Sequence, residues 1–364
     1  MKILHILNRI EFSGAEIMLN EAAPFFISKS IETHILSTGC DVGPYSSELI
    51  ESGYKVHHIS FKKSPQYLWR LLLFFKKEKF DVIHIHPERG FMMHALTAKL
   101  AGVGKIFRTY HSVFLFSGFL RKRKKFERWL LVHLLGLKNI SIGSSVQQVE
   151  RNLFNNQTTI IPNWADNQKF YPASEGERRE LRSIYGLFDS DIVLVSVGSC
   201  SQVKNHAAII NALEKVKEKV PNIVYFHAGE GELLQSEQEL AKQKGVTNFT
   251  RFFGNTNQVR EILALSDIYI MPSLHEGFSI SALEASYCGL PIIAYDVYGL
   301  RDIVINNVNG FLIDPNQEKL VDAIVKLSKN DELRKKMGGE ARGLAIANFD
   351  MESSISLLIE SYNN

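Results

Sequence analysis

The chain has 364 residues, longer than one hydrophobic core usually serves, and its 45% hydrophobic and 22% charged residues are typical of globular proteins. No apolar run is long enough to span a bilayer, which argues against a membrane-spanning helix. The net charge of +3 is uneven: residues 1–165 carry 22 Lys and Arg against 12 Asp and Glu, whereas residues 166–364 carry 20 against 27. A basic first half favours an anionic partner.

The cysteines and the N-terminus bear on the compartment. Cys40, Cys200 and Cys288 are widely spaced and odd in number, and they match neither a disulfide framework nor a metal-ligand cluster. The apolar part of residues 1–9 is too short for a signal peptide and predicts a first strand. We therefore expect a cytoplasmic protein.

Strand-like apolar runs alternate with helical patterns, and the alternation occurs twice. Several runs are almost continuously apolar, as expected for parallel strands covered on both faces. We therefore expect an α/β protein with two Rossmann-like, doubly wound domains and a ligand site in the cleft between them. The predicted strands are 2–7, 32–37, 55–60, 81–86, 105–110, 139–143 and 158–162, then 192–198, 223–228, 248–253, 267–271, 291–295 and 310–313.

The domain boundary is expected in the segment 162–172, which holds two prolines and several polar turn formers. A short charged helix over 175–185 follows it. We place the first domain at 1–165 and the second at 166–348.

Three sites in the first domain deserve a functional and a structural interpretation. Gly14 follows the first strand and would let the backbone approach a substrate, while Glu16 favours the dipole of the helix that begins there. His84 and His86 share one strand face; with no carboxylate or thiol ligand nearby in the sequence, we interpret them as structural rather than metal-binding. His111 ends another strand, where it either contacts a reacting sugar or packs in the core.

A basic run followed by an apolar stretch occupies 120–135. The segment is either a core helix with a solvated basic end or a helix that lies on an anionic membrane surface. No recognised nucleic-acid-binding module accompanies the charge, so we expect no nucleic-acid partner. The candidate membrane contacts are Arg121, Lys122, Arg123, Lys124 and Lys125.

In the second domain, the segment 197–206 follows a strand and leads into a helix that Asn205 is expected to cap. Lys204 would then stand beside a helix N-terminus, where it either holds a diphosphate or is simply solvated. The glycines of 227–232 suit a tight turn near a ligand or a helix cap, and without G-x-G-x-x-G spacing they argue against a nicotinamide enzyme.

Two carboxylates eight positions apart, Glu276 and Glu284, flank a glycine loop that runs from a buried strand into a helix. A helix N-terminus attracts phosphate, and flanking carboxylates accept hydrogen bonds from hydroxyls. The combination suggests a nucleotide sugar. In the purely structural alternative, Ser281 and Glu284 form a capping box, and Gly289 ends the helix.

These pieces, in this order, resemble glycosyltransferase family 4, whose members have the two-domain GT-B fold. The resemblance covers nearly the whole chain, and its Glu-x7-Glu element is followed by Gly-x-Pro. The final segment looks like the family's last helix, so that 349–364 would cross back to the first domain. The landmarks are 13–16, 81–86, His111, 161–166, Phe170, 198–206, 276–284 and 289–291.

The resemblance implies a retaining transferase that uses a nucleotide-diphosphate sugar, UDP rather than GDP, with no metal or other cofactor. The acceptor would be a glycan or a lipid-linked molecule that binds in the first domain. The product would be a cell-surface polysaccharide. If the basic segment 120–135 lies on a membrane, the enzyme would be peripheral on the inner face of the cell membrane. The implied catalytic residues are Glu276 at the sugar hydroxyls, Lys204 at the leaving diphosphate, and His111. Glu284 would bind the ribose. The rest of the donor would be bound by Gly14, Gly198, Ser199, Gly277, Phe278, Ser279, Ile280 and Ser281.

One departure from the family pattern concerns charge. The family usually has Arg after the glycine that matches Gly198, where this chain has Ser199. Lys204 then acts alone or with another cation such as Arg301; Asp302 in place of the usual Glu is a milder change. Two alternatives stay open: a nucleotide-sugar-binding partner subunit without activity, and a GT-B-type nucleotide-sugar epimerase.

Overall fold

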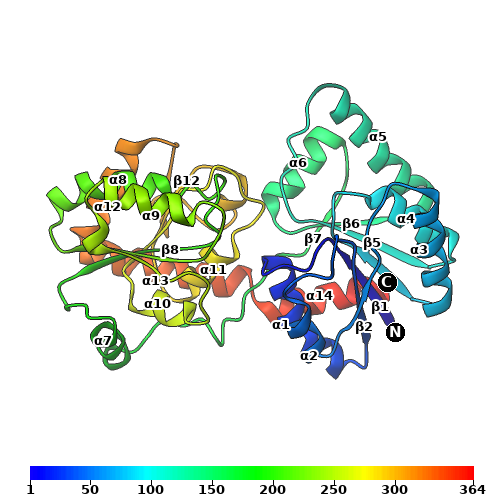
Figure 1. The fold of residues 1–364 in the computed structure, drawn as a ribbon, viewed down its shortest axis with the longest axis horizontal. Helices are drawn as coiled ribbons and strands as arrows, with labels where there is room; N and C mark the ends of the chain where they lie inside the picture. The colour runs from blue at the N-terminus through cyan, green and yellow to red at the C-terminus, as the bar shows by residue number, and fades with distance from the viewer. The chain divides into compact units, whose positions relative to one another are not determined.

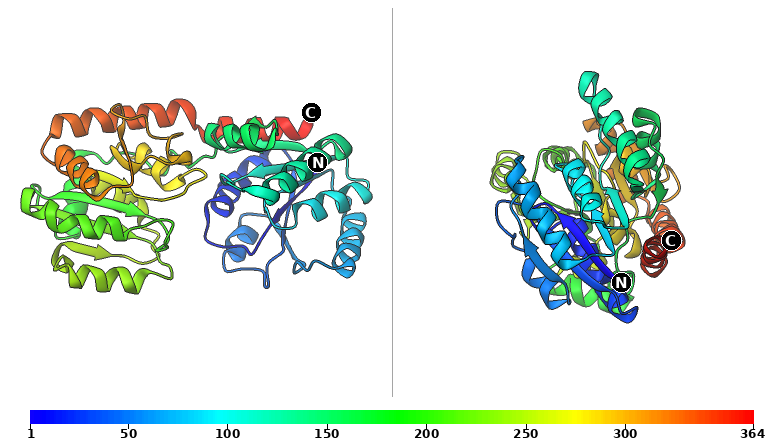
Figure 2. Two further views of the ribbon diagram at one scale, coloured as in Figure 1. Left: turned by 90° about the horizontal axis from the view of Figure 1, so that it is seen from above. Right: turned by 90° about the vertical axis from the view of Figure 1, so that its right-hand side faces the viewer.

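The computed structural model describes residues 1–364, and the chain divides into two compact units. Unit 1 comprises residues 1–163 and 352–364, and unit 2 comprises residues 164–351. Each unit is built on one sheet in which all strand pairs are parallel, and helices cover both faces of each sheet (Figure 1, Figure 2). Both sheets are doubly wound, as the alternating sequence pattern predicts.

Unit 1 holds a seven-stranded sheet of order β3-β2-β1-β4-β5-β6-β7. Its strands are β1 (Lys2–Leu7), β2 (Glu32–Ser37), β3 (Lys55–His58), β4 (Val82–Ile85), β5 (Lys105–Tyr110), β6 (Lys138–Ser141) and β7 (Thr159–Ile160). Its helices are α1 (Gly14–Ser28), α2 (Ser46–Glu51), α3 (Pro65–Glu78), α4 (Phe91–Leu100), α5 (Gly118–Leu135), α6 (Ser144–Phe154) and α14 (Met351–Asn363).

Unit 2 holds a six-stranded sheet of order β10-β9-β8-β11-β12-β13. Its strands are β8 (Ile192–Val197), β9 (Ile223–Ala228), β10 (Thr250–Phe252), β11 (Ile268–Met271), β12 (Ile292–Tyr295) and β13 (Gly310–Ile313). Its helices are α7 (Glu175–Ile184), α8 (Ala207–Lys219), α9 (Leu234–Gln243), α10 (Val259–Leu265), α11 (Ile280–Tyr287), α12 (Gln317–Ser328) and α13 (Asp331–Asn348), with short 3-10 turns at Thr247–Phe249 and Tyr298–Leu300.

The central strands are buried along their whole length. Every residue of β4, β11 and β12 is buried, which explains why these segments read as continuous apolar runs. Two predicted strands are wrong in part. The run 158–162 forms only the short edge strand β7 before Pro162, and the start of 248–253 is a 3-10 turn. Proline cannot donate to a ladder, which limits the edge strand.

The strand order reverses between β1 and β4 in unit 1 and between β8 and β11 in unit 2. At such a switch point the loops that leave the carboxyl ends of the two strands diverge, and open α/β sheets bind ligands there. In unit 2 the two loops are 198–206 after β8 and 272–279 after β11. The fold therefore brings together the two sequence segments that hold Lys204 and Glu276.

The last helix, α14, packs into unit 1 although all of unit 2 precedes it in the sequence (Figure 1). Tyr362 is fully buried, and its hydroxyl lies 2.5 Å from Nδ1 of His84. The Lys105 ammonium donates to the carbonyl of Tyr362 at 2.9 Å. These contacts tie the C-terminus to β4 and β5.

Candidate active site

Lys204 and Glu276 meet at the switch point of unit 2. The Lys204 ammonium lies 2.7 Å from Oε1 of Glu276, and the Ser273 hydroxyl donates to the same oxygen at 2.9 Å. The Glu276 residue is 8% exposed, whereas the Lys204 side chain keeps 22% of its surface. Sequence alone left Lys204 either solvated or at a ligand; the structure pairs it with a nearly buried carboxylate.

The two loops are joined to each other by hydrogen bonds beyond this ion pair. The Asn205 amide donates to the carbonyl of Pro272 at 3.2 Å, and the Leu274 N–H donates to the carbonyl of Val203 at 2.8 Å. The prediction that Asn205 caps α8 is wrong, because Asn205 has φ of +56° and its side chain reaches the other loop. The N-cap residue of α8 is His206, whose side chain makes no capping hydrogen bond.

The Lys204 side chain packs against Gly198. A Cβ on Gly198 would lie 3.5 Å from Cε of Lys204, so the lysine stem passes directly over this glycine. Gly229 approaches even closer, since its Cβ would fall 1.9 Å from the carbonyl oxygen of Gly198. The glycines after β9 thus serve close packing against the 198–200 segment. Ser199, next to Gly198, is exposed.

Helix α11 opens beside Glu276 with free donors. Ser279 caps it by accepting from the Ala282 N–H at 3.3 Å, and the first-turn N–H groups of Ser279, Ile280 and Ser281 have no backbone acceptor. The predicted capping box is wrong. The cap lies two residues earlier, and the Ser281 hydroxyl instead lies 2.9 Å from the hydroxyl of Tyr269. Gly289, with φ of +77°, does follow the helix end as predicted.

Glu284 lies in the second turn of α11 and takes no part in capping the helix. Part of its surface is accessible, yet protein surrounds its carboxyl on most sides, and this desolvation raises its pKa to about 7, against the opposing charge of Lys169. A carboxyl near its pKa at neutral pH can both accept and donate hydrogen bonds. That suits a partner with two hydroxyl groups.

The turn at Tyr298–Leu300 packs against the glycine loop between Glu276 and α11. A Cβ on Gly299 would lie 2.6 Å from the Gly277 carbonyl carbon, so only glycine allows the 298–300 turn to lie against this loop. The Phe278 ring is buried against Phe349, with ring centroids 5.3 Å apart. Arg301 ends the turn and pairs with Asp296 at 2.6 Å. The compensating cation suggested for Ser199 is thus already partnered.

In unit 1, the candidate His111 is the end of a chain of histidines. Its Nε2 lies 2.7 Å from Nδ1 of His86, whose Nε2 lies 3.1 Å from Nδ1 of His5. Burial lowers the pKa of His111 to about 4 and that of His5 to about 3, so both are neutral at pH 7. The shared face of His84 and His86 is confirmed by stacking at 4.3 Å. Sequence reasoning missed His5.

Gly14 is the first residue of α1, and the Ser13 hydroxyl before it donates to the Glu16 carboxylate. Glu16 is 5% exposed, and burial raises its pKa. Glu16 therefore holds the start of α1 together through Ser13, beyond the predicted effect on the helix dipole.

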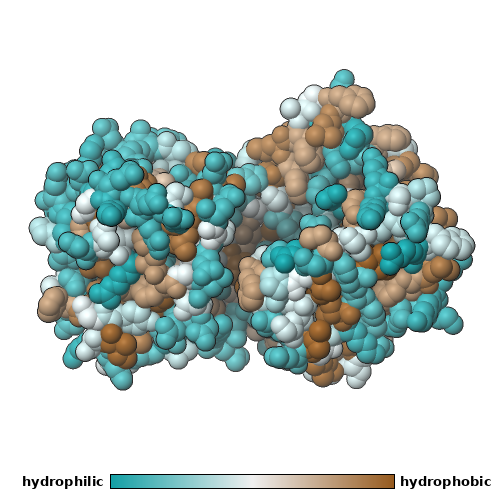
Figure 3. Space-filling view, viewed as in Figure 1, coloured by the Kyte–Doolittle hydropathy of each residue, from teal (hydrophilic) through white to brown (hydrophobic).

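The basic segment forms helix α5, which exposes both charge and apolar area. Lys124 is not part of that exposed surface, because its ammonium pairs with Glu88 and Glu127, each at 3.1 Å. Hydrophobic residues gather over this part of unit 1 in Figure 3. No helix of the chain is both long enough and apolar enough to cross a bilayer. The exposed side chains of α5 include Phe119, Arg121, Lys122, Lys125, Phe126, Trp129 and Leu134.

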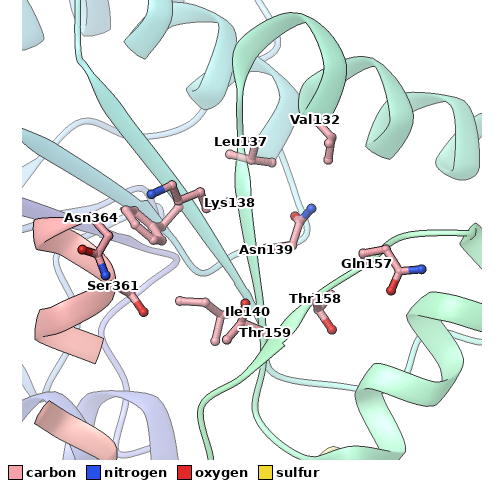
Figure 4. Close-up of a pocket in the computed structure, with 11 residues that line it drawn as sticks. Val132, Leu137, Lys138, Asn139, Ile140, Gln157, Thr158, Thr159, Ser361 and Asn364 are labelled. Carbon is pink, nitrogen blue, oxygen red and sulfur yellow. The ribbon is translucent and has the colours of Figure 1, made fainter. Parts of the chain in front are cut away.

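A hollow of about 470 Å³ lies at the β6–β7 edge of unit 1, lined by β6, β7 and the ends of α5 and α14 (Figure 4). Lys138, Asn139 and Thr158 line it together with Ser361 and Asn364 from the C-terminus. None of the residues predicted for the active site lies in it.

Comparison with known sequences decides the class. Residues 12–169 match the family described as Glycosyltransferase Family 4, and residues 177–344 match the family described as Glycosyl transferases group 1. The chain is a glycosyltransferase. It is of the hexosyltransferase type, and its two parallel-sheet units form the GT-B fold.

Two curated relatives and one solved structure illustrate the similarity. The transferase is 28% identical over 84% of its length to the Escherichia coli UDP-Gal:alpha-D-GlcNAc-diphosphoundecaprenol alpha-1,3-galactosyltransferase, covering 81% of that protein. It is 27% identical over 86% of its length to the putative glycosyltransferase EpsD of Bacillus subtilis, covering 84% of it. Anabaena HepE, solved with UDP and glucose, superposes with a TM-score of 0.84 at 18% identity, over 100% of this chain and 99% of the other.

One cluster escaped the sequence analysis altogether. Cys200 and His206, from the ends of the Lys204 loop, meet His227 of β9 and Glu237 of α9 in the core of unit 2. These positions lie far apart in sequence and match no ligand spacing. The only sequence signal was their placement at strand ends and helix starts of neighbouring βα units.

Proposed function

We propose that the transferase is a retaining member of family 4 that moves a sugar from a UDP-sugar to a glycan or lipid-linked acceptor in cell-surface polysaccharide synthesis. The observation that carries the proposal is the Lys204–Glu276 pair at the switch point of unit 2, beside the open first turn of α11. A cation and free N–H groups suit a diphosphate, and adjacent carboxylates suit the hydroxyls of sugar and ribose.

The ion pair suggests how donor binding would proceed. Glu276 holds the Lys204 ammonium at 2.7 Å. A diphosphate carries more charge than one carboxylate, so Lys204 would turn to it and leave Glu276 to accept from sugar hydroxyls. As the bond from the anomeric carbon to the diphosphate oxygen breaks, negative charge grows on the leaving group. Lys204 and the N–H groups of Ser279, Ile280 and Ser281 would stabilise that charge without a metal at the diphosphate.

The remaining donor contacts follow from the local geometry. Gly198 and Gly277 would let the backbone approach the donor closely. Ser199 and Phe278 would contact the donor through their backbone groups. Glu284 would accept from the ribose diol. In unit 1, which we propose binds the acceptor, neutral His111 would contact the reacting sugar, held in one orientation by His86. The backbone at Gly14 would approach the substrate.

UDP is the proposed nucleotide because of the relatives. The Escherichia coli relative is named for UDP-Gal, and HepE has been solved with UDP and with UDP-glucose. Calorimetry with UDP and GDP, followed by a transfer assay over a panel of UDP-sugars and lipid-linked acceptors, tests the proposal. Glycosylated acceptor is the expected product. Binding without turnover would favour the partner-subunit alternative that Ser199 suggests, and a rearranged free nucleotide sugar would favour an epimerase.

The raised pKa of Glu284 predicts a pH dependence of donor binding. Its folded-state pKa of about 7 lies above the ordinary value, so the carboxyl loses its proton as the pH rises through 7. If the ionised form accepts from both ribose hydroxyls, UDP affinity should improve roughly 10-fold between about pH 6 and pH 8. Calorimetry across this range measures it. Glu284→Gln carries no such titration, and an equally steep profile in that variant would exclude Glu284 as the source.

We also expect α5 to bind anionic membranes. Neutralising the exposed Arg121, Lys122 and Lys125 together should weaken partitioning onto anionic liposomes roughly 100-fold, at about 1 kcal/mol for each charge. Sedimentation with vesicles at low salt measures it. The matched control neutralises Lys76, Lys77 and Lys79, which are also exposed in unit 1. Equal losses in both triple variants, or binding that ignores salt, would contradict a specific α5 contact.

A further inference from the structure

Four potential metal ligands meet in the core of unit 2. Cys200, His206 and His227 are fully buried, and Glu237 is 3% exposed. One ligand atom from each lies within 4.8 Å of the others. They come from the loop after β8, the residue before α8, strand β9 and helix α9, so the surrounding βα units fix their positions.

Two of the separations between ligand atoms suit a tetrahedral ion. Zinc binds sulfur at about 2.3 Å and nitrogen or oxygen at about 2.0–2.2 Å, which places neighbouring ligands of a tetrahedron roughly 3.3–3.6 Å apart. Here Sγ of Cys200 lies 3.2 Å from Nε2 of His227, and Nδ1 of His206 lies 3.5 Å from Oε1 of Glu237. Both separations lie close to that range, and no two of the four ligand atoms are more than 4.8 Å apart.

The cluster also lacks the good hydrogen bonds that buried polar side chains require in a metal-free core. The polar atoms of His206 and Glu237 are buried but poorly paired: Nδ1 of His206 lies 3.5 Å from Oε1 of Glu237, which is long for a hydrogen bond, and Nε2 of His206 has no partner. A buried polar atom without a good partner costs free energy, and a buried carboxylate costs the most. A divalent cation would satisfy a nitrogen of His206 and an oxygen of Glu237 together.

Outer contacts orient one of the ligands. Nδ1 of His227 lies 2.8 Å from the Ser196 hydroxyl, which lies 2.6 Å from the Tyr225 hydroxyl. If Nδ1–H donates to Ser196, then Nε2 of His227 presents its lone pair toward Cys200. Fixing the tautomer through the far nitrogen is how proteins usually hold a metal-binding histidine.

We propose that Cys200, His206, His227 and Glu237 bind one Zn²⁺ ion in a closed, structural site. Binding would release the Cys200 thiol proton to solvent, and the thiolate and carboxylate together would balance the charge of the ion. The donor set of thiolate, imidazole and carboxylate is typical of zinc. With four protein ligands, the ion would have no open position for substrate.

The site would fix the loop that carries Lys204. Cys200 and His206 lie at the two ends of that loop, with Lys204 between them, so the ion would hold both ends to β9 and α9. This consequence rests on the proposed role of Lys204 at the diphosphate; the metal site itself does not. The histidines of unit 1 offer no equivalent, because both nitrogens of His84 are already bonded, to Tyr362 and Thr109.

Metal content tests the proposal on the full chain without any sugar substrate. After expression with zinc and removal of loosely bound metal, we expect about one zinc per chain, and a melting temperature that falls by several degrees when a strong chelator removes it. Cobalt added to the zinc-free protein should give the intense visible bands of tetrahedral Co²⁺ and a thiolate charge-transfer band. Cys200→Ser and Glu237→Gln should lose stoichiometric binding, whereas Cys288→Ser, at another buried cysteine, should keep it.

The opposing results are equally clear. No zinc and no tetrahedral cobalt spectrum in the wild-type chain would overturn the proposal and indicate a protonated, hydrogen-bonded cluster. Equal loss of metal in Cys288→Ser would overturn the assignment of ligands. The cobalt spectrum of the wild-type chain decides the matter even if a ligand variant fails to fold. Since none of these readouts involves a donor or acceptor, failure here is distinct from failure of the proposed function.

Discussion

Lys204→Ala should reduce sugar transfer by about 10²–10³-fold, the usual cost of removing one group that stabilises charge in a transition state. It should also weaken UDP binding roughly 10- to 100-fold, because a charge-assisted hydrogen bond to the diphosphate is lost. A transfer assay and calorimetry measure the two effects. The large effect on rate is expected because Ser199 supplies no second cation at the position where the family usually has Arg.

The matched control for this change is Lys215→Ala, which removes an exposed lysine from α8 in the same unit. It should leave both transfer and UDP binding unchanged. If Lys204→Ala transfers sugar at the wild-type rate, the assignment of the leaving-group cation is wrong. Arg301 would then be the next candidate, released from Asp296 when donor binds.

Glu276→Gln should also reduce transfer by about 10²–10³-fold, but with the opposite effect on UDP. The wild-type carboxylate holds the Lys204 ammonium at 2.7 Å, so a diphosphate must compete for it. The neutral amide competes less, and UDP should bind as tightly as to the wild type or more tightly. A transfer assay with saturating donor and UDP calorimetry separate the lost chemistry from the retained binding.

Glu214→Gln, an exposed glutamate on α8, is the control with the same change in charge. It should behave as the wild type in both assays. Thermal unfolding should show that Glu276→Gln still folds, since glutamine can keep the hydrogen bond from Ser273. A folded Glu276→Gln enzyme with full transfer activity would remove Glu276 from the catalytic site.

The sequence was sufficient for the fold because its signals are local. Continuous apolar runs mark β11 and β12, a nearly continuous one marks β4, and their alternation with helices indicates parallel sheets. Once the strand order is known, the switch point brings Lys204 and Glu276 together. Both residues were candidates from sequence because each follows a strand at its carboxyl end.

What sequence could not supply depends on tertiary contacts. Asn205 and Ser281 have the side chains of cap residues, yet Asn205 reaches Pro272 and Ser281 meets Tyr269. Local propensity cannot predict a partner on another loop or strand. The same holds for Lys124, which two glutamates remove from the exposed basic surface.

The pKa of Glu284 and the Cys200 cluster illustrate the same limit. The raised pKa arises from desolvation, which the spacing of two glutamates does not encode. The four residues around Cys200 come from four separate elements, with no motif spacing between them. Three-dimensional packing alone makes them neighbours.

The most direct test of the central claim, that Lys204 and Glu276 form a donor-diphosphate site in unit 2, is UDP calorimetry on three proteins side by side. We expect the association constant for UDP to fall at least 10-fold in Lys204→Ala but to be unchanged or higher in Glu276→Gln, relative to the wild type. Equal UDP affinity in all three proteins would contradict it, because the ion pair would then lie outside the nucleotide site.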